Sequence, residues 1–307
     1  MIKLKISIGL CVFAMLIGQA YGQSAPPSEP KKVDFPHTDI FLFDLDLTNS
    51  QQPLSQGKNA TQRQGYDNQP YFTPDSQSFL FSRGDDYQTD VYEYALGTGE
   101  ITQITDSPAT EFSPTPSNNN QKIAFVSDRN GGIWLADRAD ANHPKWLLES
   151  IDNREPVGYF ALNHDSKDLL YWSRYGYAMI LANVQTGSYH YVSGNTPPAT
   201  PHIIPNTNRF SFVHRQGNGQ VWIKELDPNS KAIRPLIMVN GPNHNYAWAP
   251  DGSILMIQND VLYRALPEQG QQWITLADLN ALRIKQANRI AISPDGKKLA
   301  VVGQSAK

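Results

Sequence analysis

Seven side chains in this sequence could act together on a ligand if the fold brings them to one place. They are one carboxylate, two imidazoles, two guanidinium groups and two amides: Glu111, His202, His244, Arg154, Arg289, Asn68 and Asn245. A carboxylate and an imidazole within reach of the same substrate can act as general acid and general base. The same two groups also suit a divalent metal ion, and an arginine offers a fork that fits a carboxylate.

The spacing of these residues matches no catalytic or metal-binding motif. The sequence contains no Gly-x-Ser-x-Gly nucleophile elbow, no phosphate-binding loop and no paired-carboxylate motif. Glu111, His202 and His244 lack the spacing of a metal site, and a single cysteine, Cys11, excludes a disulfide framework and a CxxC-type zinc site. We therefore predict no catalytic residue, no metal and no cofactor, and interpret the seven residues as a ligand-binding set.

Composition indicates a compact, turn-rich domain. The chain has 307 residues, of which 40% are hydrophobic and 18% charged, with a net charge of −3. It is long enough for one large domain and too apolar for a disordered chain. Its 21 Gly and 22 Pro residues follow no triplet period, so they indicate turns. No basic block follows the first few residues, which disfavours nucleic acid as a partner.

The first 22 residues are typical of a secretory signal peptide. Lys3 and Lys5 precede an apolar stretch over residues 6–17, and the small residues Ala20 and Gly22 follow it. That stretch is shorter than the roughly 20 residues needed to cross a bilayer. No later apolar run is long enough either, so we predict a soluble periplasmic or secreted protein with a Pro-rich leader over residues 23–36.

A repeat organises the rest of the chain. Six segments each combine a short apolar stretch, a turn and a strand rich in β-branched or aromatic residues; they cover 71–83, 112–129, 159–174, 202–215, 246–258 and 290–304. The residue that opens the turn serves as the anchor of each segment. These anchors are Pro74, Pro116, about Asn163, Pro205, Pro250 and Pro294, in steps of 42, 47, 42, 45 and 44 residues. A period of this length matches one four-stranded propeller blade.

A hairpin pattern completes five of these repeats. Alternating apolar and polar residues flank a turn in segments 90–105, 132–148, 178–193, 220–238 and 261–276. The sixth repeat has no such hairpin, while an additional hairpin at 39–56 precedes the first. We predict an all-β, six-bladed β-propeller over residues 37–304, closed by pairing of the N-terminal hairpin with the C-terminal strands. The alternatives are an open stack and a seven-bladed ring with one unit missed.

The repeat also predicts where the ligand-binding set lies. The innermost strand of each blade lines the central channel, so residues just before it should gather at one mouth. Counting five or six residues back from each anchor selects Asn68 and Gln69, Thr110 and Glu111, Val157 and Gly158, Ala199 and Thr200, His244 and Asn245, and Asn288 and Arg289. Arg154 precedes the third inner strand. Converging polar groups at a concave mouth can bind a small molecule or a peptide. Alternatively, the mouth is polar because water fills it, and Arg154 forms a surface ion pair with Glu155.

The repeats resemble those of the TolB-type propeller family. The resemblance rests on KIAFVSDRNGGIWLADR (122–138), DVYEYALGTGEITQIT (90–105) and SPDGKKLAV (293–301), and it covers residues 67–304. It implies an exported propeller. TolB, the periplasmic member of the Tol-Pal envelope system, has an additional N-terminal α/β domain. Only roughly 14 residues separate the signal peptide from the first strand here, so we expect that domain to be absent. Serine peptidases of the prolyl-oligopeptidase type use similar blades with a hydrolase domain that this sequence lacks.

These observations favour a binding protein over an enzyme. We predict a periplasmic scaffold that binds an envelope protein or a peptide at the channel mouth. The alternative is a channel-site hydrolase or lyase acting on a sugar, a lactone or a peptide fragment, with Glu111 and His244 as general acid or base.

Overall fold

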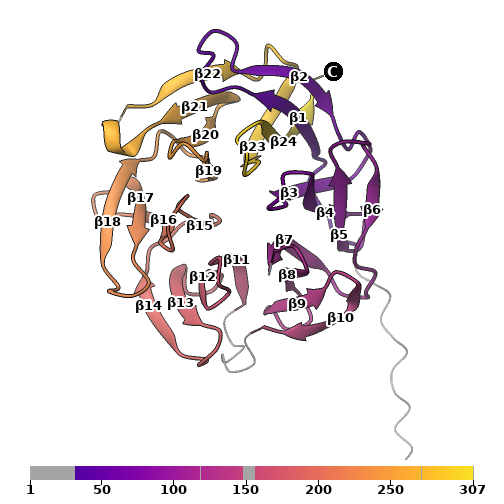
Figure 1. The fold of residues 1–307 in the computed structure, drawn as a ribbon, viewed down its shortest axis with the longest axis vertical. Coiled ribbons are helices and arrows are strands. Elements are labelled where there is room, and N and C mark those ends of the chain that lie inside the picture. Colours follow the sequence, from indigo (N-terminus) through magenta and orange to yellow (C-terminus); the bar gives the residue numbers. More distant parts are fainter. Residues whose placement is uncertain (1–31, 118, 148–155, 271, 307) are drawn as a thin grey trace, which may run out of the picture. The chain divides into compact units, whose positions relative to one another are not determined.

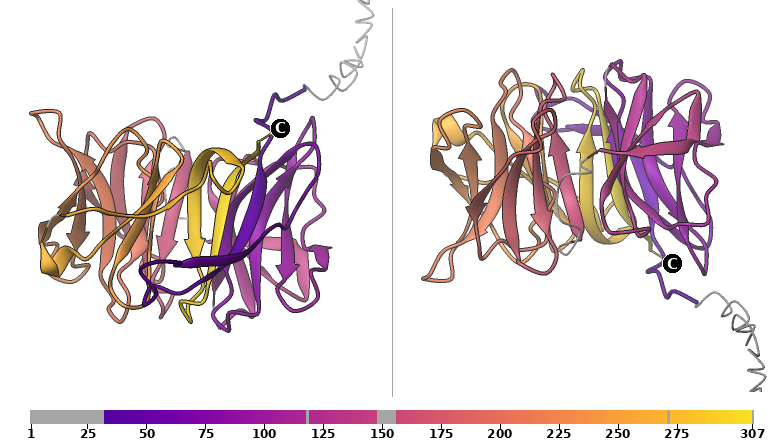
Figure 2. Two further views of the ribbon diagram at one scale, coloured as in Figure 1. Left: turned by 90° about the horizontal axis from the view of Figure 1, so that it is seen from above. Right: turned by 90° about the horizontal axis from the view of Figure 1, so that it is seen from below.

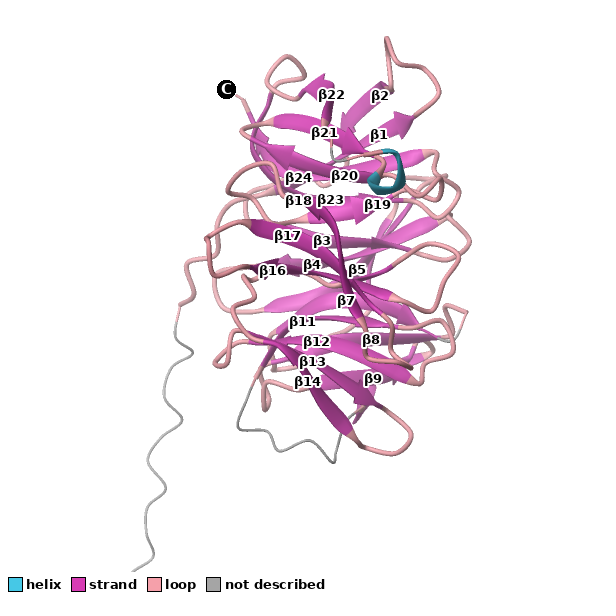
Figure 3. Ribbon diagram, turned by 90° about the vertical axis from the view of Figure 1, so that its left-hand side faces the viewer, coloured by secondary structure: helices cyan, strands magenta, loops and turns pink. Residues whose placement is uncertain are grey.

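The structure is a computed structural model that describes residues 32–117, 119–147, 156–270 and 272–306. These residues form 24 strands and one short 3-10 helix, η1 (Pro267–Gln269). The strands make six antiparallel four-stranded sheets arranged as blades around a common axis (Figure 1). The predicted six-bladed propeller is therefore confirmed. Strands account for almost all the regular structure of the ring (Figure 3), and no helix in the described ranges has the length and apolar character to cross a bilayer.

Five blades follow the order of the chain, each running from its innermost to its outermost strand. Blade 1 contains β3 (Tyr66–Phe72), β4 (Ser78–Gly84), β5 (Thr89–Ala95) and β6 (Ile101–Gln103). Blade 2 contains β7 (Glu111–Ser117), β8 (Lys122–Ser127), β9 (Ile133–Asp137) and β10 (Asp140–Trp146). Blade 3 contains β11 (Val157–Leu162), β12 (Asp168–Ser173), β13 (Ala178–Asn183) and β14 (Tyr189–Ser193). Blade 4 contains β15 (His202–Ile203), β16 (Phe210–Arg215), β17 (Val221–Leu226) and β18 (Ile233–Met238). Blade 5 contains β19 (Tyr246–Trp248), β20 (Ile254–Gln258), β21 (Val261–Ala265) and β22 (Ile274–Asp278).

Blade 6 joins the two ends of the propeller. Its strands, from inside to outside, are β23 (Ile284–Ile292), β24 (Lys298–Ser305), β1 (Asp39–Leu45) and β2 (Leu54–Asn59). Strand β1 pairs with β24 from Asp39 opposite Gly303 to Asp44 opposite Lys298, so the indigo and yellow strands lie side by side (Figures 1 and 2). The predicted closure by the N-terminal hairpin is confirmed. Closure leaves no blade without a neighbour, which protects the sheet edges.

The core lies between the blades. Six clusters of buried apolar side chains fill the six interfaces between neighbouring blades. At the closing interface, Phe79 and Phe81 of blade 1 pack with Ile40 and Val302 of blade 6, and all four side chains are fully buried. Complete burial of such a side chain contributes about 1.5–3 kcal/mol. The second strand of each blade is apolar on both faces because it contacts both neighbours, which explains the uninterrupted apolar runs in the repeats.

The first turn of each blade corrects two of the predicted anchors. The N–H of Thr73 closes this turn on the carbonyl of Ser78, and Asn163 does the same with Asp168, so Asn163 corresponds to Thr73 rather than to Pro74. In blade 2, Ser117 pairs with Lys122 at this position, so Pro116 lies inside β7. The second and third repeats were therefore aligned two residues and one residue too early. Pro116 was mistaken for the start of a turn. It fits inside β7 because β7 is an edge strand, where a missing N–H is tolerated.

Candidate functional site

A cavity of about 250 Å³ lies between the inner strands of the blades. Six side chains occupy equivalent positions around it, each four residues before the residue that closes the first turn. We call them the polar ring: Gln69, Ser113, Tyr159, Thr200, Asn245 and Arg289. All but Tyr159 line the cavity directly. Ring members also contact one another across blades, since the Gln69 Oε1 accepts a 2.7 Å hydrogen bond from the Ser113 N–H.

A second ring follows two residues further along each inner strand. Its members are Tyr71, Thr115, Ala161, His202, Ala247 and Ala291, and all but Ala161 line the cavity. Three of the six are alanines, whose small side chains leave space around the central axis of the propeller. Tyr71 remains 41% exposed although it belongs to an inner strand, because its ring borders this space. The cavity is thus partly aromatic and partly polar, as small-molecule and peptide sites commonly are.

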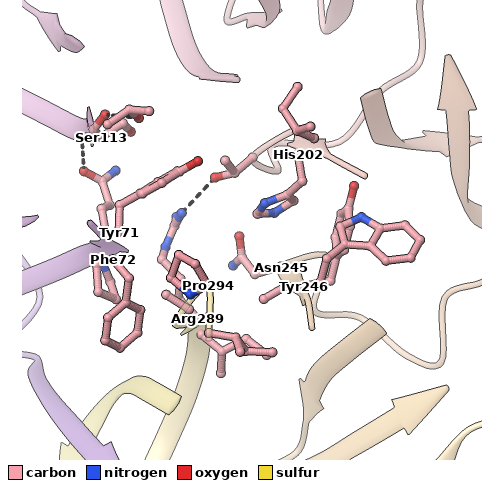
Figure 4. Close-up of a pocket in the computed structure, with 18 of the residues that line it drawn as sticks. Tyr71, Phe72, Ser113, His202, Asn245, Tyr246, Arg289 and Pro294 are labelled. Atoms are coloured by element: carbon pink, nitrogen blue, oxygen red, sulfur yellow. Dashed lines mark hydrogen bonds between the residues drawn. The ribbon is translucent and has the colours of Figure 1, made fainter. Parts of the chain in front are cut away.

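Among the described residues that line the cavity, Arg289 is the one permanently charged side chain. Its guanidinium group donates hydrogen bonds to the Thr200 Oγ1 at 3.0 Å and to the Tyr159 hydroxyl at 3.4 Å. Figure 4 draws the first of these bonds as a dashed line from Arg289. It also lies 5.1 Å from the centre of the Tyr159 ring, within the range of a cation–π contact. Since Arg289 starts from blade 6 and Tyr159 belongs to blade 3 on the opposite side of the ring, the side chain extends across the cavity.

The remaining wall is neutral and closely hydrogen-bonded. The His202 ring packs edge-on against Tyr246, with centroids 4.6 Å apart. Burial, together with the positive charge of Arg289, lowers the pKa of His202 to about 4, so the imidazole is neutral at pH 7. Behind it, the Ser211 hydroxyl is 2.7 Å from the Tyr246 hydroxyl and accepts a 2.8 Å bond from the Trp248 Nε1. This wall holds its side chains in fixed positions.

Three of the seven residues selected from the sequence line the cavity: His202, Asn245 and Arg289. Asn245 is anchored there by its own hydrogen bonds. Its Nδ2 donates to the Asn288 carbonyl at 3.0 Å, which links blade 5 to blade 6. These three side chains come from blades 4, 5 and 6, whereas the cavity as a whole is lined by residues of all six blades.

The other described members of the set lie away from the cavity. Glu111 is 1% exposed near blade 1, where its Oε1 accepts a 2.8 Å bond from the Ser107 hydroxyl, and burial raises its pKa. Asn68 is also buried, and its Oδ1 accepts the N–H of Gln69. His244 is half-buried before β19; burial, then the charge of Arg215, lowers its pKa.

The geometry therefore does not bring Glu111 and His244 together. Glu111 opens blade 2 and His244 precedes blade 5, on opposite sides of the six-bladed ring. In the described ranges they share no hydrogen-bond partner. Arg154, the seventh residue of the set, lies outside the residues that the structure describes.

Tyr71, Ser113 and Trp248 also line the cavity, although none of them belongs to the set selected from the sequence. The early anchor in the second repeat selected Glu111 instead of Ser113, and the anchor in the third selected Gly158 and Val157 instead of Tyr159. Alignment on the buried second strands would have corrected both, because the runs at 79–81, 123–125 and 169–171 occupy one register. The correct register of the repeats was therefore visible in the buried second strands and not in the turns.

The cavity is equipped to bind an anionic or hydrogen-bonding group. The lining residues that the structure describes include hydroxyls, amides, two histidines and one arginine, but no Asp or Glu. No cluster of three or more His, Cys, Asp or Glu side chains suited to a metal occurs within the described ranges. What the site offers chemically is one fixed positive charge beside neutral donors and aromatic rings.

Comparisons with known proteins identify this architecture. Among solved structures, the putative TolB from Agrobacterium tumefaciens is similar with a TM-score of 0.62 and 14% identity, over 87% of this chain and 98% of that chain. TolB from Acinetobacter baumannii is similar with a TM-score of 0.56 and 14% identity, over 90% of this chain and 66% of that chain, just under two thirds of its length. An oligogalacturonate lyase in complex with manganese has a TM-score of 0.56 and 13% identity, over 86% and 82% of the two chains.

At these identities the similar structures show the fold alone. Curated proteins gave no sequence match. A family model described as the TolB beta propeller domain, however, matches residues 38–250, well over half of the chain. Together with the six blades, this match shows that the chain belongs to the TolB beta-propeller family.

Proposed function

We propose that the protein is a binding module whose axial cavity receives part of a protein or peptide partner. The observation that carries this proposal is the cavity enclosed by the polar ring. Its volume of about 250 Å³ is slightly below the 300–1,000 Å³ of pockets that take drug-sized ligands. It therefore suits a chain end or a single side chain of a larger partner, whose remaining contacts would fall on the surrounding loops.

The rigidity of the wall supports binding. The side chains of the second ring project from inner strands that are paired along one edge, and the bonds of Ser211 fix Tyr246 and Trp248. A site whose groups are already ordered loses less conformational entropy when it binds. Pre-organisation of this kind favours a partner that inserts into the channel.

The compartment forms part of the proposal. Residues 1–22, which read as a signal peptide, lie outside the described residues, so the support comes from their sequence alone. An exported protein would meet its partner in the periplasm or outside the cell, so we propose an envelope protein or an exported peptide.

A channel-site hydrolase or lyase is the other hypothesis. It relied on Glu111 and His244, which belong to opposite blades and do not line the cavity. The similarity to an oligogalacturonate lyase concerns the fold and carries no residue-level support. The geometry consequently favours binding over acid–base chemistry by that pair.

Cross-linking in intact cells tests the proposed function. The full chain, produced with its own N-terminus and a C-terminal tag, is cross-linked and purified, and the attached proteins are identified by mass spectrometry. Tyr71→Ala removes an aromatic ring from the cavity, whereas Tyr189→Ala removes an exposed ring from the outer strand β14. We expect the same partner with the wild type and Tyr189→Ala, and at least a tenfold reduction with Tyr71→Ala. Equal capture by all three proteins contradicts binding at the cavity.

A further inference from the structure

We propose that the ligand of the cavity presents a carboxylate, and that Arg289 binds it. This inference rests on the proposed function, because it names the chemical group that the same site would recognise. It depends on the charge, the contacts and the surroundings of Arg289.

Arg289 differs from every other arginine that the structure describes. Six of them form ion pairs with carboxylates: Arg63, Arg83, Arg138, Arg209, Arg234 and Arg264. Four others have no ion pair among the described residues and are exposed to solvent: Arg129, Arg174, Arg215 and Arg283. Arg289 alone is half-buried in a cavity with no described carboxylate partner. Because an arginine side chain does not lose its proton in a protein, Arg289 stays positively charged in this cavity.

The hydrogen bonds of Arg289 leave most of its donors available. A guanidinium group carries five N–H bonds, and in the described ranges one goes to the Thr200 hydroxyl and one to the Tyr159 hydroxyl. Both acceptors are neutral, so they orient the group without neutralising it. A ligand carboxylate can replace or add to these contacts through two parallel N–H···O bonds.

The surroundings select an anion of a single charge. No Asp or Glu is among the described residues that line the cavity, so a carboxylate meets no repulsion from this part of the wall. His202 is neutral, which leaves one positive charge to balance. A phosphate would bring up to two negative charges and leave part of its charge uncompensated. Tyr71, Trp248 and Pro294 provide apolar contacts for the group that bears the carboxylate.

Such a carboxylate has two sources, a small organic acid or the C-terminus of a partner chain. Comparing each acid with its amide tests whether the carboxylate is recognised. Comparing small acids with a peptide acid tells a small organic acid from the C-terminus of a chain. The small probes are propionate, benzoate and hippurate with their amides. The peptide probe is N-acetyl-Gly-Gly-Phe as free acid and as C-terminal amide. Binding to the full chain is measured by saturation-transfer NMR and then by calorimetry.

The expected result is that at least one acid binds and its amide binds 10- to 100-fold more weakly, as fits the loss of a charge-assisted hydrogen bond. Binding of small acids points to a metabolite, whereas binding of the peptide acid alone points to a chain end. Arg289→Gln should weaken acid binding by a similar factor. Arg289→Lys keeps the positive charge but loses the two parallel N–H donors, so it should weaken acid binding to an intermediate degree.

The control variant is Arg283→Gln, which removes an exposed arginine that does not line the cavity. It should bind the acids as the wild type does, and thermal unfolding checks that every variant is folded. Equal binding of acid and amide, no binding of any acid, or unchanged binding by Arg289→Gln overturns the carboxylate assignment. Partner capture that depends on Tyr71 would persist in any of these cases, so failure of this inference is separable from failure of the proposed function.

Discussion

Two charged side chains on inner strands, one fully buried and one half-buried, have opposite surroundings. Asp67 in blade 1 is fully buried, and both its oxygens are bonded: the Nε of Arg83 lies at 2.9 Å, a second Arg83 nitrogen at 3.2 Å, and the Nε of Arg63 at 3.2 Å. Arg289 in blade 6 has only hydroxyl partners among the described residues and faces a cavity. Asp67 is satisfied within the chain, whereas Arg289 is not.

The difference separates a structural charge from a binding charge. The backbone N–H of Asp67 bonds the carbonyl of Thr38, and the Thr38 hydroxyl bonds the Asp67 carbonyl, so this carboxylate lies where blade 1 meets the segment before β1. Its ion pairs therefore support closure of the ring. Nothing comparable depends on Arg289, whose contacts cross an open cavity. A charge that the fold does not neutralise is free to interact with a ligand.

The largest expected effect is that of Asp67→Asn. The change leaves two partly buried guanidinium groups without their carboxylate, which costs about 3–5 kcal/mol. At about 2–4 °C per kcal/mol for a domain of this size, the melting temperature should fall by roughly 6–20 °C. Thermal unfolding followed by circular dichroism measures it. Asp137→Asn, at an exposed ion pair with Lys122, is the control and should cost less than about 1 kcal/mol. Similar losses for both variants contradict a structural role for the Asp67 cluster.

Ser211→Ala tests the wall of the cavity. The hydroxyl is buried and bonds both the Tyr246 hydroxyl and the Trp248 Nε1, so its removal leaves two polar groups without this partner. We expect a loss of about 1–3 kcal/mol in the free energy of unfolding, measured by urea denaturation. The exposed Ser188→Ala provides the baseline. A cost no greater than that baseline means that the wall is not held by this hydroxyl.

Glu111→Gln tests a third ionisable group through the pH dependence of stability. Glu111 occupies in blade 2 the position of Asp67 in blade 1, but Ser107 is its bonded partner instead of arginines. Burial raises the pKa of Glu111, so the protonated form is favoured by folding. Its stabilising contribution is complete below the unfolded pKa and is lost as the pH rises through the folded pKa.

The glutamine variant does not titrate, so it should gain stability relative to the wild type between pH 4 and pH 8. We expect a difference of about 1 kcal/mol, the lower end of the cost of an unsatisfied buried polar group. Melting temperatures of both proteins across this range measure it. A constant difference at all pH values means that Glu111 does not titrate in this range.

The fold was predictable because it depends on repetition. Six apolar second strands and five following hairpins fixed the number of blades, and the additional hairpin at 39–56 revealed the closure. These features reflect the burial of side chains such as Phe79 and Phe125 between neighbouring blades, which constrains residue type strongly.

The site was predictable only in part because it depends on single residues of an edge strand. Inner strands pair on one side only, so they tolerate the prolines and left-handed residues, such as Gln69 and Ser113, that shift the register. Arg289 and Asn245 were found because their turns are regular, whereas His202 was selected for its imidazole and not by the count from Pro205. Glu111 was selected in place of Ser113 because a proline inside β7 imitated a turn.

The smallest expected effect is that of Arg289→Gln on stability. The variant loses hydrogen bonds to the Thr200 and Tyr159 hydroxyls, each worth about 0.5–1.5 kcal/mol, but it also removes a half-buried charge that lacks a carboxylate partner. The two effects oppose each other, so the free energy of unfolding should change by less than about 1 kcal/mol, measured by urea denaturation beside Arg283→Gln. A loss as large as that of Asp67→Asn would make Arg289 a structural charge as well. A small change together with lost acid binding means that the fold keeps this charge at little benefit to its own stability, as expected of a residue that serves a ligand.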